Sequence, residues 1–402
     1  MKHVVVGGGV IGASIAWHLA ECGLGEVVLL ERDRLGSGTT WHSAGNITWK
    51  PSPEHDAPVL YAFETIARLE RELGLATGWL ETGRTFLAAS NEVREDLANF
   101  DRLANERGIA TRWLSPKEAS ALNPLLNPAA VDGIWFNPLS GRLNPADLTA
   151  AYATAARRSG AEIREGVDVL GVTTAGGRVA GIETSAGFLA ADRIVVAAGL
   201  WSRPLLQPLG FSLAQWPCEH CYVIAEVTPQ LARQTPSFVM PDSLVYGREE
   251  VGKFLVGFFD ENAKTLDPTG LPKPFSFTLL EPDWDKIAPY FMAATQVFPA
   301  LEHAPIHRFI NGPESFTPDG LPLIGQLEGI DGLYVATAMN STGVTWSAMT
   351  GRLIVDLVAG QESRFNAKRY DPHRFADLGR DLEWLTAKVS AIVSAGYRHQ
   401  NK

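Results

Sequence analysis

A histidine in a glycine-rich loop is the residue of this chain with the clearest chemical implication. His42 lies in the stretch from Gly36 to Asn46, GSGTTWHSAGN, whose small residues leave room for a ligand close to the backbone. An imidazole held there is a nucleophile as well as a hydrogen-bonding group. The loop directly follows a nucleotide-binding pattern, so we expect His42 to meet a bound nucleotide cofactor, and a covalent bond to it is the sharper hypothesis.

Two strands and a helix must position that loop. Residues 3–6 and 26–30 are short, β-branched-rich runs typical of buried parallel strands, and residues 11–20 have the composition of a helix. Glu31 follows the second strand, at the expected spacing of about 20 residues from the glycines. Strand, glycines, helix, second strand and acidic residue together predict a dinucleotide-binding unit, and they outweigh the alternative of a glycine-rich turn without a ligand.

Each residue of the pattern has a separate task. Gly7 permits the tight turn after the strand, Gly9 lets the backbone approach a pyrophosphate, and Gly12 lets the helix pack closely on the strand. The helix N-terminus then faces the phosphates, and Glu31 accepts hydrogen bonds from the ribose hydroxyls.

Length and composition bound the function. A chain of 402 residues suggests two to three lobes, and 46% hydrophobic with 20% charged residues is typical of a globular protein. A net charge of −10 without a basic run argues against nucleic-acid binding. The first strand leaves no room for a cleavable leader, and no apolar run reaches the length of a membrane span. We therefore expect a cytoplasmic protein.

The three cysteines do not predict a disulfide framework. Cys218 and Cys221 form a Cys-x-x-Cys pair, but the chain has no second pair, and His303 and His307 would complete a metal site only by coincidence of folding. Residues 216–224 have the pattern of a strand. Two unpaired cysteines within a strand are therefore the favoured interpretation, and no metal is expected.

The later elements return to the nucleotide-binding sheet, so the organisation along the chain is discontinuous. We expect a helix over Pro145–Ser159, capped by Asn144, because Asn is a strong N-cap and Pro suits the first turn. The other expected elements are an amphipathic helix over Ala62–Leu75, a charged helix over Glu92–Gly108, strands at 162–164 and 192–199, and a strand-rich region over 216–258.

Three stretches carry a family resemblance: residues 39–45, TTWHSAG; residues 311–320, NGPESFTPDG; and residues 339–343, MNSTG. They resemble the flavin-dependent D-amino acid oxidase superfamily, most closely its dimethylglycine and sarcosine dehydrogenase branch. The resemblance implies an α/β (mixed α+β) fold with a Rossmann-like FAD-binding domain and a β-rich substrate domain. The implied ranges are 1–78, 139–205 and 301–385 for FAD, 79–138 and 206–300 for substrate, and 386–402 as a C-terminal tail.

The resemblance also implies the cofactor site. It assigns His42 to a covalent bond with the 8α-methyl carbon of FAD, which raises the flavin potential; the alternative is a histidine packed against the flavin edge without a bond. The residues expected around FAD are Gly7, Gly9, Val10, Ile11, Gly12, Glu31, Arg32, Ser37, Thr39, Thr40, His42, Ser43, Ala44, Gly45, Val169, Ala197, Ala198, Gly199, Trp201, Gly320, Pro322, Asn340, Ser341, Thr342, Gly343 and Val344.

A helix start near residue 343 completes the flavin prediction. Ser341 or Thr342 can cap the helix over 344–358, and Gly343 lets its backbone amides approach a ligand. A helix N-terminus aimed at the pyrimidine end of the flavin would stabilise negative charge on the reduced ring by roughly 0.3–2 kcal/mol. An ordinary helix cap is the alternative.

The expected reaction is oxidation of an amine. Hydride leaves the carbon next to a neutral amine, whereas alkylammonium groups titrate near 10.4, so the site must favour the neutral form. His220 and Tyr222, which alternate on one strand, resemble the His and Tyr of the related dehydrogenases; we expect His220 as base or orienting group and Tyr246 as substrate hydrogen-bonder. Structural hydrogen bonds within the sheet are the alternative. Candidates to bind a substrate carboxylate are Arg248, Arg84 and Arg142.

Two departures limit the transfer of substrate. The relatives carry a long C-terminal folate-binding region that this sequence lacks, so a one-carbon unit is expected to leave as formaldehyde. Residues 46–49 also differ from the pattern expected after the histidine loop. We expect oxidation of an N-methylated amine or amino acid, with oxygen or an electron-transfer partner as acceptor. The alternatives are a noncovalent oxidase of a primary or cyclic amino acid, and a flavoprotein subunit of a sarcosine oxidase-like complex.

Overall fold

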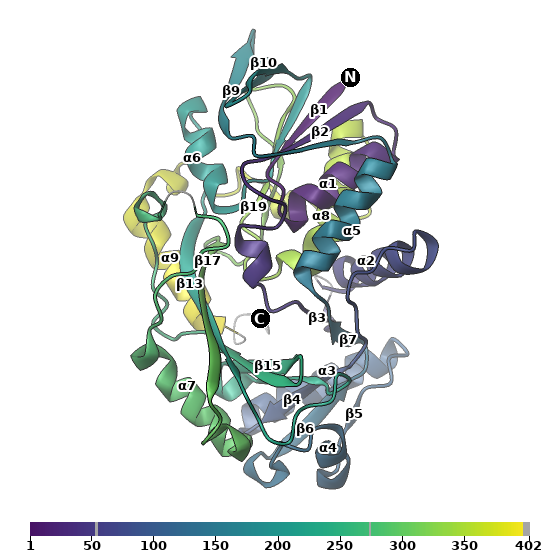
Figure 1. Cartoon of the computed structure of the whole chain (residues 1–402), viewed down its shortest axis with the longest axis vertical. Helices are drawn as coiled ribbons and strands as arrows, with labels where there is room; N and C mark the ends of the chain where they lie inside the picture. The colour runs from purple at the N-terminus through teal and green to yellow at the C-terminus, as the bar shows by residue number, and fades with distance from the viewer. Residues whose placement is uncertain (53–54, 273–274, 397–402) are drawn as a thin grey trace.

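The computed structural model describes residues 1–52, 55–272 and 275–396, which contain two large sheets stacked end to end (Figure 1). The first is six-stranded; β1 pairs in parallel with β2 and β12, while β18 is an antiparallel edge. Its spatial order is β18 (Leu323–Gln326), β19 (Leu333–Thr337), β12 (Arg193–Val196), β1 (Lys2–Val6), β2 (Glu26–Glu31) and β8 (Glu162–Glu165).

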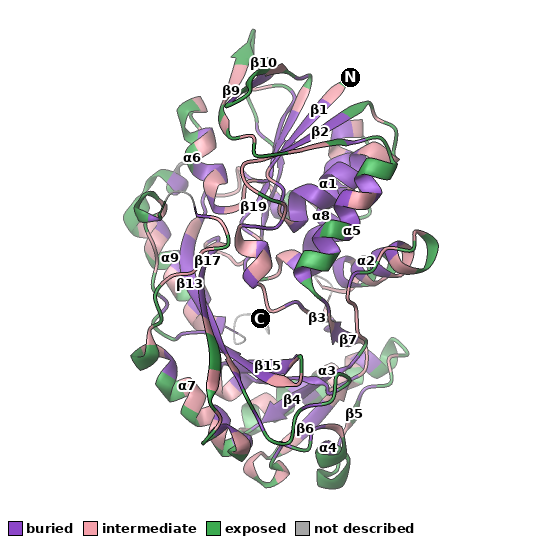
Figure 2. Cartoon of the chain, in the orientation of Figure 1, coloured by how far each residue is buried: buried purple, intermediate pink, exposed green. Residues whose placement is uncertain are grey.

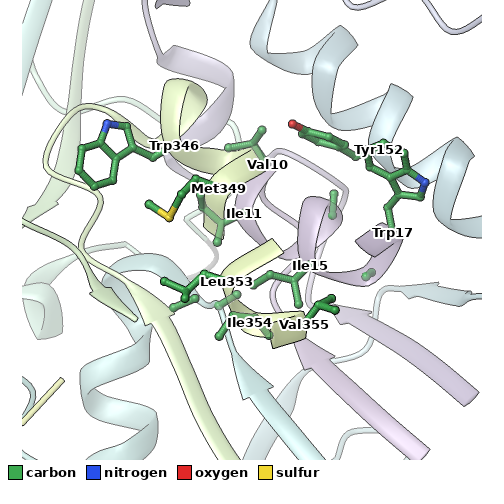
Figure 3. Packing of buried hydrophobic residues seen from close by; sticks show 14 of the residues in the cluster. Val10, Ile11, Ile15, Trp17, Tyr152, Trp346, Met349, Leu353, Ile354 and Val355 are labelled. Atoms are coloured by element: carbon green, nitrogen blue, oxygen red, sulfur yellow. The ribbon is translucent and has the colours of Figure 1, made fainter. Parts of the chain in front are cut away.

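Three helices cover one face of this sheet: α1 (Val10–Glu21), α5 (Pro145–Arg158) and α8 (Gly343–Ala359). Apolar side chains such as Ile15 and Leu353 gather between α1 and α8 (Figure 3), and both helices are buried along most of their length (Figure 2). Polar contacts fix the packing, since Ser14 Oγ donates to the Ser347 carbonyl at 2.8 Å. The βαβ unit, and helix α5 with Asn144 as its cap, are confirmed.

The opposite face is covered by a three-stranded meander and a short helix. Valines and leucines of β1 and β2 pack there against Val179 and Ile182. The covering elements are β9 (Val169–Ala175), β10 (Arg178–Thr184), β11 (Gly187–Ala190) and α6 (Ser202–Leu206). With helices on one face and a meander on the other, the parallel strands are buried on both faces, which explains their continuous apolar runs.

The second large sheet is eight-stranded and predominantly antiparallel. One edge strand of this sheet is formed by residues 306–316. The expected domain ranges assign these residues to the FAD domain, so the expected boundary at residue 301 differs from the division between the two sheets. The spatial order is β17 (Ile306–Phe316), β13 (Trp216–Ala225), β16 (Lys253–Phe258), β15 (Val245–Glu250), β14 (Ser237–Met240), β4 (Arg84–Ala88), β6 (Gly133–Asn137) and β5 (Arg112–Trp113).

Helices cover parts of both faces of the second sheet. The outer face packs on α7 (Trp284–Val297) and α4 (Pro116–Leu122), and the inner face, which carries the site, packs on α3 (Asn91–Glu106) and α9 (Leu382–Ala395). Much of the expected tail over 386–402 is therefore helix α9, with Val389 and Val393 buried; residues 397–402 lie outside the described residues. A small ribbon of β3 (Asn46–Thr48) and β7 (Ser140–Arg142) lies between the two sheets (Figure 1).

Two expectations about local structure have definite outcomes. The helix expected over Ala62–Leu75 instead begins earlier, as α2 (Asp56–Ala67), and continues as a π-helical turn over Arg68–Glu72. Its first turn contains Pro58, whose missing N–H costs nothing there. The strand over Cys218 and Cys221 is confirmed, and both thiols are free and buried. Among the described residues, no helix is long and apolar enough to cross a membrane.

Close packing at Gly12 gives a first test. A Cβ at Gly12 would lie 1.8 Å from the Gly7 carbonyl oxygen, so Gly12→Ala must push α1 away from the turn after β1. We expect a loss of about 3 kcal/mol or more in the free energy of unfolding, measured by urea denaturation. Gly171→Ala is the matched control, because a Cβ there meets open space. Equal stability of the two variants would contradict the packing argument.

Candidate active site

A cavity of about 350 Å³ opens at the carboxyl ends of the parallel strands. This is the edge at which α/β sheets bind nucleotides. Most of the residues expected around the cofactor lie in its wall: Gly7, Gly9, Val10, Ile11, Glu31, Arg32, Ser37, Thr39, Thr40, Ser43, Val169, Ala197, Ala198, Gly199, Trp201, Asn340, Ser341, Gly343 and Val344.

The other expected cofactor residues lie outside that wall: Gly12, His42, Ala44, Gly45, Gly320, Pro322 and Thr342. Sequence reasoning in turn missed wall residues: Val6, Leu30, Gly38, Val167, Asp168, Leu200, Pro204, Leu205, Glu314, Ser315, Ala336, Thr337, Ala338 and Met339. Val6, Leu30 and Ala336 stand at the ends of parallel strands, so strand position could have indicated them. The segments at 167–168 and 204–205 carry no such signal.

The glycine turn and the histidine loop are joined by hydrogen bonds. The Gly8 amide donates to Glu31 Oε2 at 2.6 Å, and the Val10 amide donates to Thr40 Oγ1 at 3.1 Å. Thr40 therefore accepts a hydrogen bond from an amide in the first turn of α1, which the N-cap residue Gly9 cannot accept because it has no side chain. Burial raises the pKa of Glu31, which lines the cavity while it closes the turn.

His42 lies at the end of the loop, in a short 3₁₀ turn over Thr39–His42, and is buried. Its ring rests on β17, where a Cβ at Gly312 would lie 2.6 Å from both Cε1 and Nε2. Among the described residues, nothing hydrogen-bonds to Nε2. Burial lowers the pKa of the imidazole to about 4, against the opposing effect of Glu314. A neutral imidazole with an unpartnered nitrogen is the form needed for bonding to a carbon centre.

The chain after His42 runs across the inner face of the second sheet. Arg248 Nε, on β15, donates to the Ala44 carbonyl at 2.6 Å, and Asn137 Nδ2, on β6, donates to the Trp49 carbonyl at 2.7 Å. These bonds attach the loop to strands at both ends of its path. The second sheet therefore determines where His42 stands relative to the cavity of the first.

His220 and Tyr246 form a hydrogen-bonded pair on that inner face. His220 Nε2 and Tyr246 Oη are 2.8 Å apart, and the two rings are nearly parallel, at 6°. The tyrosine ring lies flat over β16, because a Cβ at Gly257 would come within 2.3 Å of its Cζ. Burial lowers the pKa of His220 and raises that of Tyr222, on the same strand, to about 12. The structure thus brings together the residues expected to act on an amine.

The three candidate arginines are engaged with the protein. Besides its bond to Ala44, Arg248 forms an ion pair with Glu250. Arg142, on β7, forms an ion pair with Glu249, which is on β15 next to Arg248. Arg84 donates to Thr48 Oγ1 and to the Phe238 carbonyl. Their guanidinium groups hold the histidine loop and the ribbon on the sheet, and binding of a substrate carboxylate by any of them stays a prediction.

The start of α8 differs from the expected cap. Thr342 is the N-cap residue, but its hydroxyl donates to the Met339 carbonyl, and Ser341 Oγ donates to Glu314, so neither side chain caps the helix. Gly343 and Val344 in the first turn line the cavity. Uncapped amides at a helix N-terminus favour a negative partner, and a contact of these amides with the flavin stays a prediction.

The glycine turn and the cavity at the strand ends indicate a nucleotide-binding protein, and comparison with known families identifies the nucleotide-dependent family. The chain belongs to the DAO family of FAD-dependent oxidoreductases, whose model matches residues 2–357. The family and the mixed α/β fold expected from the sequence are confirmed. FAD is accordingly the nucleotide that the cavity is built to hold.

Relatives from the expected branch match over almost the whole chain. The 4-methylaminobutanoate oxidase (formaldehyde-forming) of Paenarthrobacter nicotinovorans is 33% identical over 97% of this chain and 47% of the relative. Sarcosine dehydrogenase of Homo sapiens is 31% identical over 98% and 44%, respectively. The chain thus spans less than half the length of these relatives. Among solved structures, L-proline dehydrogenase from P. horikoshii is 25% identical with a TM-score of 0.82, covering 93% of this chain and 97% of that one.

The ring seat at Gly257 can be tested by a double-mutant cycle. Gly257→Ala should displace the Tyr246 ring and break its bond to His220, lowering the free energy of unfolding by about 1–3 kcal/mol in urea denaturation. In a Tyr246→Ala background the same glycine substitution should cost much less, because no ring remains to be displaced. An equal cost in both backgrounds would show that the glycine does not support the ring.

Proposed function

We propose that this chain oxidises the C–N bond of an N-methylated secondary or tertiary amine or amino acid, with FAD bound covalently through His42. The proposal depends mainly on one observation: the buried His42 ring, with its unpartnered Nε2, and the hydrogen-bonded His220–Tyr246 pair lie on the same face of the second sheet. Gly312, which supports His42, is the direct strand partner of His220. A flavin edge held by His42 would therefore lie close to an amine held by His220.

The residues of the cavity fit FAD along its length. Gly7 and Gly9 would face the pyrophosphate, Glu31 the ribose, and the first turn of α8 the pyrimidine end of the ring. The unpartnered Nε2 of His42 fits a bond to the 8α-methyl carbon, which is at the end of the flavin ring opposite the pyrimidine. When bound, FAD supplies the hydride acceptor.

The protein groups would prepare the amine. A buried site disfavours the ammonium form, and a neutral imidazole within hydrogen-bond reach can take its proton. His220 would supply this imidazole, because it is buried with a lowered pKa and its Nε2 is held by the hydrogen bond to Tyr246 Oη. The neutral amine then gives up hydride from its N-methyl carbon, and water hydrolyses the resulting iminium to the demethylated amine and formaldehyde.

The relatives support this substrate class. The names of two of them specify a methylamino substrate and formaldehyde formation, or sarcosine. A second candidate is oxidation of a primary amino acid, supported by glycine oxidase of Geobacillus kaustophilus, which is 28% identical over 90% of this chain and 94% of its own length. A role as one subunit of a larger complex, the electron acceptor and a cytoplasmic location stay predictions.

Covalent attachment can be tested by acid precipitation. Wild-type protein should keep its yellow colour in the pellet, whereas His42→Ala should release all flavin into the supernatant. Gly312→Ala should still bind FAD but lose most covalent attachment, at least tenfold in the flavin absorbance of the pellet, because the new Cβ displaces the imidazole. Gly171→Ala is the control and should behave as wild type. A colourless wild-type pellet would refute the covalent bond, and a coloured His42→Ala pellet would refute this anchor.

Substrate class can be tested by anaerobic reduction. Sarcosine, N,N-dimethylglycine and 4-methylaminobutanoate should bleach the flavin at least tenfold faster than glycine or proline, and formaldehyde should appear in equimolar amount with reduced flavin. His220→Asn should slow bleaching by about 10²-fold or more while FAD stays bound. Faster bleaching by glycine or proline, without formaldehyde, would favour the second candidate.

A further inference from the structure

One buried carboxylate that lines the cavity, near the His220–Tyr246 pair, has no role in the function proposed so far. Glu314 is on β17, two residues beyond Gly312, so its side chain lies on the sheet face that carries His42 and His220. It is 7% exposed and lines the cavity. Ser341, at the entry to α8, donates its hydroxyl to the carboxylate and thereby orients it.

The carboxylate lacks a counter-charge within the described part of the chain. No described lysine or arginine lies within ion-pairing distance of Glu314, and burial lowers the pKa values of the nearby His42 and His220, which disfavours their cationic forms. Other carboxylates on strands of this sheet differ in this respect, because each pairs with a cation: Glu219 with Lys286, Glu249 with Arg142, and Glu250 with Arg248.

A buried carboxylate is costly in its ionised form unless a cationic partner offsets the lost hydration. We propose that the partner is the substrate: Glu314 binds the ammonium group of a secondary or tertiary alkylamine. This inference rests on the proposed function and adds to it the group that recognises the incoming cation. Such amines titrate near 10.4 and therefore arrive charged at neutral pH.

The position of Glu314 suits that task. It lines the cavity and lies on the same sheet face as His220, whose strand pairs with its own, so an ammonium held by its carboxylate would lie near the imidazole that accepts the proton. The aromatic rings of Tyr246 and Phe259 beside His220 suit the methyl groups of an alkylated nitrogen. A competing role is a contact with the flavin ring itself, which would not depend on the charge of the amine.

A pair of probes that differ in charge but have similar shape separates these roles. Tetramethylammonium cannot be oxidised through a nitrogen lone pair, and tert-butanol is a neutral molecule of comparable size. Binding of each to the oxidised holoenzyme is followed through the flavin absorbance difference at constant pH and ionic strength. The wild type should bind tetramethylammonium about tenfold or more tightly than tert-butanol.

Glu314→Gln keeps the size of the side chain and removes the charge, so it should abolish this preference and leave tert-butanol affinity within about threefold. Glu314→Asp should retain the preference for the cation. Glu226→Gln is the matched control, because Glu226 is half-exposed and paired with His307, and it should bind both probes as wild type does.

Absence of cation preference in the wild type, or its persistence in Glu314→Gln, would overturn the assignment. The wild-type comparison needs no variant, so a misfolded Glu314→Gln does not leave the proposal untested. The bleaching experiment with amines is separate: if amines fail to bleach the flavin, the proposed function fails, whereas loss of probe selectivity alone removes only the role of Glu314.

Discussion

The contact on which the site depends is the packing of the His42 ring against the backbone of Gly312. Small residues carry the loop away from the nucleotide-binding turn, and its Thr40 hydroxyl satisfies an amide of α1. The loop then meets an antiparallel sheet built from distant parts of the chain. Because a strand residue without a side chain leaves space for a ring, the imidazole approaches the sheet closely enough to be buried. The first sheet shapes the cavity, and the second determines the position of the His42 imidazole.

A second glycine of the same sheet, on β16 and two strands from β17, supports a ring in the same way. Tyr246 lies flat over Gly257 and hydrogen-bonds to His220, so aromatic and imidazole rings lie close against this inner face. Arg248 neutralises Glu250 and holds the Ala44 carbonyl. The charged groups of this part of the site are thus largely paired with one another, and Glu314 is a buried carboxylate that has no described lysine or arginine partner.

Much of the fold follows from local sequence patterns. The βαβ unit, the Asn144 cap and the strand that holds both cysteines depend on short-range physics, and a signature of glycines with Glu31 predicts the nucleotide cavity. Other features depend on contacts distant in sequence. Ser341 precedes a helix and is a residue type that favours the N-cap, yet its hydroxyl donates to Glu314, 27 residues away in the chain. Glu314 could not be singled out beforehand, since only the pairing of β17 with β13 places it beside His220.

The central claim is that this sheet-supported imidazole is the point at which the protein holds its cofactor. Proteolysis of the yellow holoenzyme followed by mass spectrometry of the peptide that contains His42 tests it most directly. The account predicts that this peptide carries the added mass of a flavin and that fragmentation places the modification on the imidazole. An unmodified His42 peptide recovered in full yield from flavin-saturated protein would contradict it.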